Sequence, residues 1–300
     1  MKRLPSPELF FPVRDRLYIM LGAVLFSTGG VAIKASTLTG WQLSCFRSLA
    51  AGLALLILLP SARRGWTWRS LVVGIPFAST FTLFTLANKY TTAANAIFLQ
   101  DTAPLYILLL GPILLGERIQ RRDLAFMASL VIGLGLIFSA SSEMTLNATD
   151  PRLGDILALI SGFTWALTVL GFRWIAVRAP GSGESPATAM VSGCFIASLI
   201  GLPFAFPVEN ATVSNGLIIA YLGIFQIGLA YVFISEGVLR LRALEVSLLL
   251  LVEPVFSPVW VWLILNESPA GLALIGGAVV IAATALNALR DGASGQPVAS

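Results

Sequence analysis

The sequence predicts an all-α integral membrane protein built from two similar halves, and three observations lead to this prediction. Hydrophobic residues make up 57% of the 300-residue chain and charged residues only 11%, whereas soluble domains carry about 25% charged residues. Ten apolar segments approach the length of roughly 20 residues that a membrane-spanning helix needs. Finally, Glu117 and Glu267 lie half the chain apart, and each follows a proline, Pro104 or Pro254, by the same interval.

The apolar segments are continuous rather than alternating, so we interpret them as helices and not as the tilted strands of a membrane β-barrel. No small-residue cleavage site follows the first segment, which is therefore expected to be a retained span. The polar stretches between segments are no longer than loops, so no separate water-soluble domain is expected. The predicted spans cover residues 17–36, 41–60, 70–88, 93–115, 123–140, 153–174, 187–206, 217–237, 244–265 and 270–289.

The distribution of Lys and Arg predicts the orientation of these helices, because cytoplasmic loops are enriched in basic residues. With the N-terminus inside, all but four of the 19 Lys and Arg residues fall on the cytoplasmic side. The exceptions are Lys34, Lys89 and Arg152 in outer loops and Arg47 within a span. We therefore predict a multi-pass protein of the bacterial cytoplasmic (inner) membrane with both ends in the cytoplasm.

The two halves are predicted to cover residues 17–140 and 153–289, with five spans each. An odd number of spans means that the second half enters the membrane upside down relative to the first. A second alignment of the halves places Phe26 opposite Trp165. Such inverted repeats are typical of transporters that work by alternating access around a site between the repeats.

Several classes of function are disfavoured by what the sequence lacks. The chain has no histidine, which removes the usual general base and most zinc sites. Cys45 and Cys194 lie in separate apolar segments and are expected to serve as small packing residues. A Walker A motif is absent, so ATP is not expected to drive transport within this chain. We therefore predict that the protein is not an enzyme and uses no cofactor, metal or nucleic acid.

The chain resembles the EamA family of the drug/metabolite transporter superfamily over nearly its whole length. The residues that carry the resemblance are Pro104 with Gly116-Glu117, Pro254 with Asn266-Glu267, Arg47, and Trp165-Ala166. Phe26 departs from a tryptophan common in the first unit, and Asn266 replaces a glycine. The resemblance implies a basket of spans 1–4 and 6–9 with spans 5 and 10 at the periphery, and it is greatest to YddG-type amino-acid exporters.

Candidate substrate-binding residues come from polar and aromatic positions within the spans. Phe77, Phe81, Phe84 and Asn88 share one face of the third span. Tyr231 is the repeat equivalent of Phe81, and Trp165 lies near mid-depth beside Thr168. We predict that the substrate contacts Trp165, Phe77, Phe81, Asn88, Gln100, Tyr231 and Thr168. The alternative for each aromatic residue is ordinary core packing.

Pro104 and Pro254 are predicted to interrupt their helices near mid-depth, as a hinge or cavity wall or as a simple structural kink. Each proline would free the carbonyl four residues earlier, that of Gln100 or Leu250. Small residues at four-residue spacing in spans 5 and 10 allow close helix contact, either within the chain or between protomers.

Charged residues within spans are costly and therefore candidate functional groups. We expect Arg47 to pair with Asp101 or to attract a substrate carboxylate, since its planar fork matches a carboxylate. Glu253 is a candidate for proton coupling or a structural hydrogen-bond acceptor. Glu117 and Glu267, at helix ends, are expected to anchor the chain at the membrane surface.

The function that these features favour is secondary transport, with export of small metabolites, and in particular of amino acids including aromatic ones. A multidrug or lipophilic-cation exporter, another metabolite exporter and a channel remain as alternatives. The expected partners are a small-molecule substrate and the lipid bilayer. The sequence leaves the oligomeric state open, with a monomer among the options.

Overall fold

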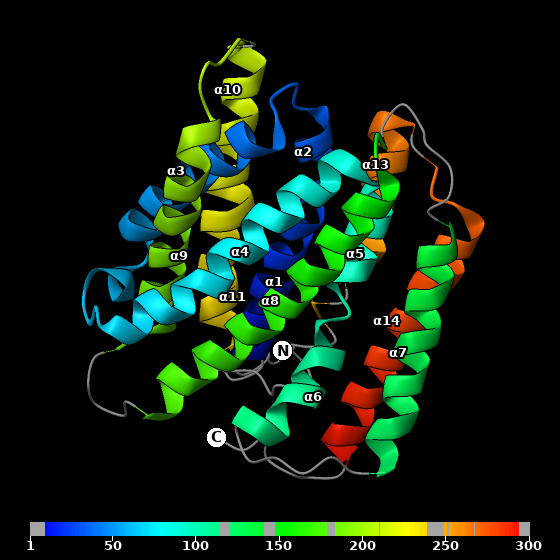
Figure 1. The fold of residues 1–300 in the computed structure, drawn as a ribbon. Helices are drawn as coiled ribbons and strands as arrows, with labels where there is room; N and C mark the ends of the chain where they lie inside the picture. The colour runs from blue at the N-terminus through cyan, green and yellow to red at the C-terminus, as the bar shows by residue number, and fades with distance from the viewer. Residues whose placement is uncertain are drawn as a thin grey trace, which may run out of the picture.

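The computed structural model of this protein describes residues 10–114, 121–140, 148–178, 184–209, 211–238, 249–250, 252–266 and 268–293, and these residues are almost entirely helical or in short connections. The helices run roughly alongside one another, with α4 and α8 side by side through the middle of the molecule (Figure 1).

The described part of the first half contains seven α-helices. They are α1 (Phe10–Ser27), α2 (Gly29–Ala35), α3 (Gly40–Leu58), α4 (Trp68–Tyr90), α5 (Ala93–Gln100), α6 (Ala103–Leu114) and α7 (Arg121–Ala140). Threonine hydroxyls cap the start of two of them, α3 and α5. The Thr39 hydroxyl accepts from the Gln42 backbone N–H, and the Gln42 side chain accepts from the Thr39 N–H. Thr92 similarly caps α5 through Asn95.

The second half contains a comparable series. It comprises α8 (Pro151–Arg178), α9 (Pro186–Gly201), α10 (Val213–Ala220), the π-helix η4 (Tyr221–Leu229), α11 (Ala230–Val238), α13 (Val252–Leu265) and α14 (Gly271–Ala293). The 3-10 turns η2 (Pro60–Arg63) and η3 (Leu202–Phe204) follow α3 and α9. Ser185 and Thr212 cap α9 and α10 by accepting from the Ala187 and Asn215 N–H groups.

Seven of the predicted spans coincide with helices that are long and apolar enough to cross a membrane. These helices are Arg14–Ala35, Gly40–Leu58, Trp68–Tyr90, Ala93–Gly111, Pro151–Ile175, Pro186–Phe204 and Val213–Ser235. Three shorter apolar helices, Leu124–Ile137, Val252–Leu265 and Gly271–Leu286, lie within the other three predicted spans. Ten membrane crossings and the orientation of the helices remain predictions.

The interruption expected at Pro104 is present. The sequence predicted a break or kink at the proline, and the helix breaks just before it, since α5 ends at Gln100 and α6 begins at Ala103. Pro104 is therefore in the first turn of α6, where a backbone N–H has no helical partner and its loss costs little. Pro254 lies in α13, and residues 249–250 before it are also helical.

Two further irregularities were not predicted. The first span is interrupted at Thr28, between α1 and α2. The eighth span is π-helical from Tyr221 to Leu229. π-Helical turns often mark functional positions, because they change which side chains face a neighbouring helix.

The two halves make reciprocal contacts where α3 crosses α9. A Cβ atom added to Gly52 would lie 3.2 Å from Cys194 Cβ, and one added to Gly201 would lie 2.9 Å from Cys45 Cβ. Both cysteines are buried free thiols that serve as small packing residues, as expected. Because exchanging the halves turns one contact into the other, the two contacts are related by an approximate two-fold axis.

The same relationship holds for α7 and α14, which pack against each other at one side of the molecule (Figure 1). A Cβ atom on Gly133 would lie 3.0 Å from the Gly276 carbonyl oxygen, and one on Gly276 would lie 2.6 Å from that of Gly133. The small residues of spans 5 and 10 therefore mediate packing within the chain, which was one of the two expected outcomes.

Candidate functional site

An aromatic cluster lies where the two halves meet. We define it as Phe26 of α1, Phe77 and Phe81 of α4, Phe172 of α8 and Tyr231 of α11. The Phe77 ring centroid is 4.6 Å from that of Phe81 and 5.8 Å from that of Tyr231, and the Phe26 and Tyr231 centroids are 5.2 Å apart. Phe77 is completely buried.

The predicted residue Trp165 packs against the same hydrophobic core as this cluster. Four of the seven predicted substrate-binding residues thus lie in one region, namely Phe77, Phe81, Tyr231 and Trp165. The repeat alignment had already placed Phe26 at the position equivalent to Trp165, and Phe26 is also in this region.

Arg47 of α3 is the largest fully buried side chain in the described part of the protein, and it lies beside Phe81 of the aromatic cluster. Its Nη2 atom donates to the Phe81 carbonyl oxygen at 2.9 Å, and its guanidinium carbon lies 5.5 Å from the Phe81 ring centroid. The buried Nε–H has no hydrogen-bond partner. The carbonyl group and the ring that hold the guanidinium are both uncharged. The positive charge of Arg47 is therefore not balanced by a negative one at these contacts.

Arg47 does not form an ion pair with Asp101, which was one of its two expected roles. Among the described residues, no carboxylate lies within ion-pair distance of Arg47. The physical reason is the packing of α3, which lies against α9 and η4, whereas Asp101 follows α5, which packs against α8 and α13. Similar depth along two helices does not bring their side chains together.

Asp101 instead lies near Glu253, and we call these two residues the carboxyl pair. The helices at whose ends they lie, α5 and α13, pack against each other. Asp101 caps the C-terminal end of α5, and Glu253 lies in the first turn of α13. The Asp101 Oδ2 atom is buried and has no hydrogen-bond partner.

The other predicted polar residues already have partners within the protein. Gln100 Nε2 donates to Ser161 Oγ at 2.8 Å, and Ser161 Oγ donates to the Thr80 carbonyl oxygen at 3.1 Å. Thr168 is fully buried, and its hydroxyl donates to the Thr164 carbonyl oxygen of its own helix at 2.9 Å. Gln100 therefore joins α5 to α8, whereas the Thr168 hydroxyl is satisfied within α8.

Asn88 lies at the interruption of the first span. Its Nδ2 donates to the Phe84 carbonyl oxygen at 2.9 Å, while its buried Oδ1 has no partner. A Cβ atom on Gly30 would lie 3.2 Å from this Oδ1. Asn88 thus faces the beginning of α2. It does not face the aromatic cluster, although Phe77 and Phe81 of that cluster lie on the same predicted stripe of α4.

Side chains of the second half hold this interruption in place. The Thr28 and Tyr221 hydroxyls are 2.7 Å apart, and Trp260 Nε1 donates to Ser27 Oγ at 2.9 Å. Gln226 Nε2 donates weakly to the Phe26 carbonyl oxygen at 3.5 Å. Sequence reasoning missed this feature, although Ser27-Thr28-Gly29-Gly30 within an apolar segment was an available signal.

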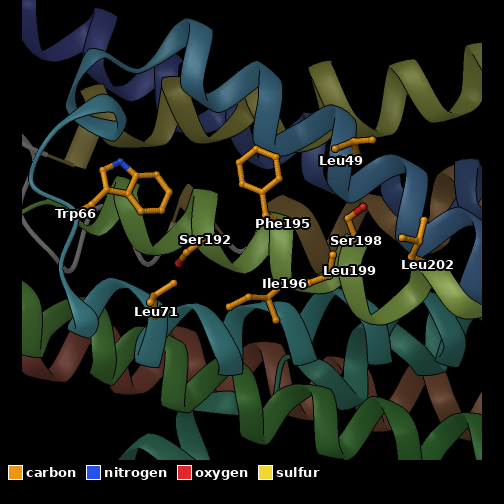
Figure 2. A pocket seen from close by; sticks show the side chains of 9 residues that line it. All are labelled: Leu49, Trp66, Leu71, Ser192, Phe195, Ile196, Ser198, Leu199 and Leu202. Atoms are coloured by element: carbon orange, nitrogen blue, oxygen red, sulfur yellow. The ribbon is translucent and has the colours of Figure 1, made fainter.

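A groove of about 300 Å³ on the outside of the molecule is distinct from this region (Figure 2). It is lined by Leu49, Trp66, Leu71, Ser192, Phe195, Ile196, Ser198, Leu199 and Leu202. The lining is almost entirely apolar, and Leu199 is 71% exposed. Such a surface suits contact with lipid, and the polar atoms of Trp66, Ser192 and Ser198 in its lining already bond within the protein.

Among the described residues, no three His, Cys, Asp or Glu side chains come together as a metal site. Glu117 and Glu267, predicted as surface anchors, lie outside the described residues.

Comparison with known proteins gives a consistent family assignment. The model of the EamA-like transporter family matches residues 16–139 and 152–289. An uncharacterized transporter of Archaeoglobus fulgidus is 29% identical over 69% of this chain and 70% of its own length. The uncharacterized transporter YyaM of Bacillus subtilis is 25% identical, and the match spans 58% of each protein.

Two further matches extend over nearly the whole chain. The pseudopaline exporter CntI of Pseudomonas aeruginosa is 24% identical over 92% of this chain and 96% of its own length. A solved crystal structure superposes with a TM-score of 0.63 at 20% identity, covering 94% of this chain and 99% of that one. The structural match shows the shared fold alone.

Proposed function

The chain belongs to the EamA-like transporter family and is thus a membrane transporter, and on that premise we propose that it exports amino acids, including aromatic ones, by alternating access. The proposal places it in the bacterial cytoplasmic membrane as a secondary carrier. The approximate two-fold relationship of the halves supports this mechanism, because mirrored halves can exchange conformations around a site between them.

The observation that carries the choice of substrate is Arg47, a buried cation with no acidic partner among the described residues, next to the aromatic cluster. Burying an unpaired charge is expensive, so a protein retains one where a ligand completes it. A carboxylate is the group that best matches the planar donors of a guanidinium. The adjacent Phe and Tyr rings would contact an apolar or aromatic side chain of the same ligand.

A second candidate function is export of lipophilic cations. It is favoured by the carboxyl pair, since two nearby acids attract a positively charged ligand. The similarity to a protein named as a pseudopaline exporter supports export of a metabolite more generally. A channel is less well supported. Inverted repeats around a central site are typical of carriers that alternate between an inward-facing and an outward-facing state.

The experiment is counterflow in proteoliposomes preloaded with unlabelled phenylalanine, tryptophan, threonine or methionine. We expect saturable uptake of the labelled amino acid, and we expect Trp165→Ala to reduce it strongly, because the indole belongs to the core around the aromatic cluster. Trp66→Ala is the matched control, since Trp66 lines the lipid-facing groove (Figure 2).

Three outcomes separate the candidates. No exchange of any amino acid by folded protein overturns the proposed cargo, and exchange of tetraphenylphosphonium would then favour the lipophilic-cation exporter. Conductance without saturation or counterflow would favour a channel. Equal loss of exchange in Trp165→Ala and Trp66→Ala would remove the special role of Trp165.

A further inference from the structure

We infer that the apolar groove shown in Figure 2 binds an acyl chain of an anionic phospholipid, and that Arg63 and Arg64 at one end of the groove contact the phosphate of its headgroup. The ligand is thus a lipid with a net negative charge and not simply any lipid of the bilayer. The inference goes beyond the proposed function, because it depends on the location of the chain in a membrane and not on the transported substrate.

The shape of the groove suits one acyl chain. Trp66 stands at one end of the groove and Leu202 at the other (Figure 2). Along α9 the lining begins at Ser192, and it continues to Leu202 in η3. At a helical rise of 1.5 Å per residue this segment is about 15 Å long, which is about half of the roughly 30 Å hydrocarbon core of a bilayer. The groove is therefore about as long as the hydrocarbon layer of one leaflet.

The lining offers contacts for hydrocarbon. Leu71 is 52% exposed and Leu199 is 71% exposed, so both side chains are open to the membrane. Ser192 Oγ is already engaged, since it donates to the Ser70 carbonyl oxygen at 2.6 Å. A polar group that entered such a groove would give up hydrogen bonds to water without replacing them, whereas an acyl chain has none to lose.

Trp66 places one end of the groove next to the turn η2. Its Nε1 atom donates to the Ala62 carbonyl oxygen at 3.0 Å, and η2 packs against α9. Arg63 and Arg64 directly follow Ala62, and both are exposed. The Cα atom of Arg64 lies within about 7.6 Å of that of Trp66, because neighbouring Cα atoms are about 3.8 Å apart. Two arginines therefore lie beside the end of the groove that Trp66 marks.

Neither of these arginines is neutralised by an acid. The Arg63 side chain donates to the carbonyl oxygens of Leu56, at 2.7 Å, and Ile57 at the end of α3, and these groups carry no net charge. In the part of the chain that the structure describes, no carboxylate lies within ion-pair distance of Arg63 or Arg64. A phosphate group at this end of the groove would balance their charge, and the planar donors of a guanidinium match a phosphate well.

Arg69 shows how the same region treats a cation that serves the fold. Its Nη1 atom lies 3.2 Å from Glu184 Oε2, and its guanidinium carbon lies 5.8 Å and 5.5 Å from the ring centroids of Trp68 and Trp174. Arg69 thus joins α4 to the second half through an ion pair and an aromatic contact. Arg64, five residues earlier, has no acidic partner among the described residues, which leaves its charge available to a lipid headgroup.

The test reads the quenching of Trp66 fluorescence by brominated acyl chains, because bromine quenches an indole that it contacts. The full-length protein is reconstituted in vesicles of dioleoylphosphatidylcholine that contain increasing mole fractions of brominated phosphatidylglycerol or brominated phosphatidylcholine. The signal of Trp66 is the difference between the unmodified protein and Trp66→Phe. Trp262 of α13, which is 55% exposed, provides the reference for general contact with lipid through Trp262→Phe.

We expect brominated phosphatidylglycerol to quench Trp66 at a mole fraction about fivefold or more below that of brominated phosphatidylcholine, which corresponds to about 1 kcal/mol for a basic residue near the membrane surface. Arg64→Gln should lower this preference, and Arg63→Gln combined with Arg64→Gln should reduce it to within about twofold. The control Arg152→Gln, an exposed arginine outside the groove, should leave it unchanged. Arg64→Gln keeps the bonds of Arg63 to α3, so it tests the inference even if the double variant does not fold.

Several results would overturn the inference. Equal quenching of Trp66 by the two lipids would reduce the groove to a general contact with the bilayer. A preference for phosphatidylglycerol that persists in the folded double variant, or that is equally strong at Trp262, would place the headgroup elsewhere. No quenching of Trp66 by either lipid would mean that protein, such as a second copy of the chain, covers the groove. Substrate exchange is measured separately, so failure of the proposed cargo is distinguishable from each of these results.

Discussion

Replacing Arg47 with methionine should separate a role in transport from a role in stability. Methionine is long, flexible and apolar, so it fills much of the same volume without the charge. The substitution removes the hydrogen bond from Nη2 to the Phe81 carbonyl oxygen at 2.9 Å and the contact with the Phe81 ring at 5.5 Å. It also removes a buried Nε–H that has no partner.

The opposing contributions to stability are of similar size. A hydrogen bond to a charged group contributes about 1.5–3 kcal/mol, and a buried cation–π contact about 0.5–2 kcal/mol. Against their loss stands the desolvation of a buried ion, which is several kcal/mol. We therefore expect the free energy of unfolding to change little, and the melting temperature in detergent to stay within a few degrees of the original or to rise.

Transport should respond very differently. A charged hydrogen bond to a substrate carboxylate, about 1.5–3 kcal/mol, corresponds to a loss of roughly 10- to 100-fold in affinity. The assay is the half-saturation concentration of phenylalanine in proteoliposome counterflow. Arg47→Lys should give an intermediate value, because it keeps the charge and loses the planar fork.

The reasoning would be refuted by the opposite pattern. A marked fall in melting temperature for Arg47→Met, together with an unchanged half-saturation concentration, would make Arg47 a structural residue that stabilises α3 against α4. The same conclusion would follow if 3-phenylpropionate inhibited the variant as well as it inhibits the unmodified protein.

Two further predictions concern packing around the site. Gly193→Val should lower the melting temperature by several degrees and impair exchange, because a Cβ atom there would lie 2.6 Å from Phe77 Cδ1 and 2.8 Å from the Gly74 carbonyl oxygen, and overpacking costs about 1–3 kcal/mol. Gly216→Val, with no atom within 4 Å of the added Cβ, should change neither quantity. Trp260→Phe should destabilise the interruption of the first span by about 0.5–1.5 kcal/mol through loss of the bond to Ser27 Oγ, seen as a lower melting temperature and faster amide hydrogen exchange at residues 27–30. The control Trp262→Phe replaces a ring that is 55% exposed, and equal effects of the two substitutions would contradict the assignment.

The sequence by itself determined the features that depend on composition and length along one segment. Long apolar runs located the helices, because each must satisfy its own backbone hydrogen bonds within the membrane. The repeated proline and glutamate positions indicated two related halves. The aromatic stripe of α4 and its repeat equivalent Tyr231 identified part of the central cluster, since side chains on one helical face stay together.

Only the tertiary structure decided which helix faces meet. Lipid is as apolar as a protein core, so a membrane helix carries little sequence information about its rotation. That is why Asp101 could be placed at the depth of Arg47 although it follows α5, which packs against α8 and α13 and not against α3. It is also why Asn88, on the same stripe as Phe77, faces Gly30 instead of the aromatic cluster. The interruption at Thr28 likewise depends on partners from other helices, Tyr221 and Trp260, which no local pattern in the sequence specifies.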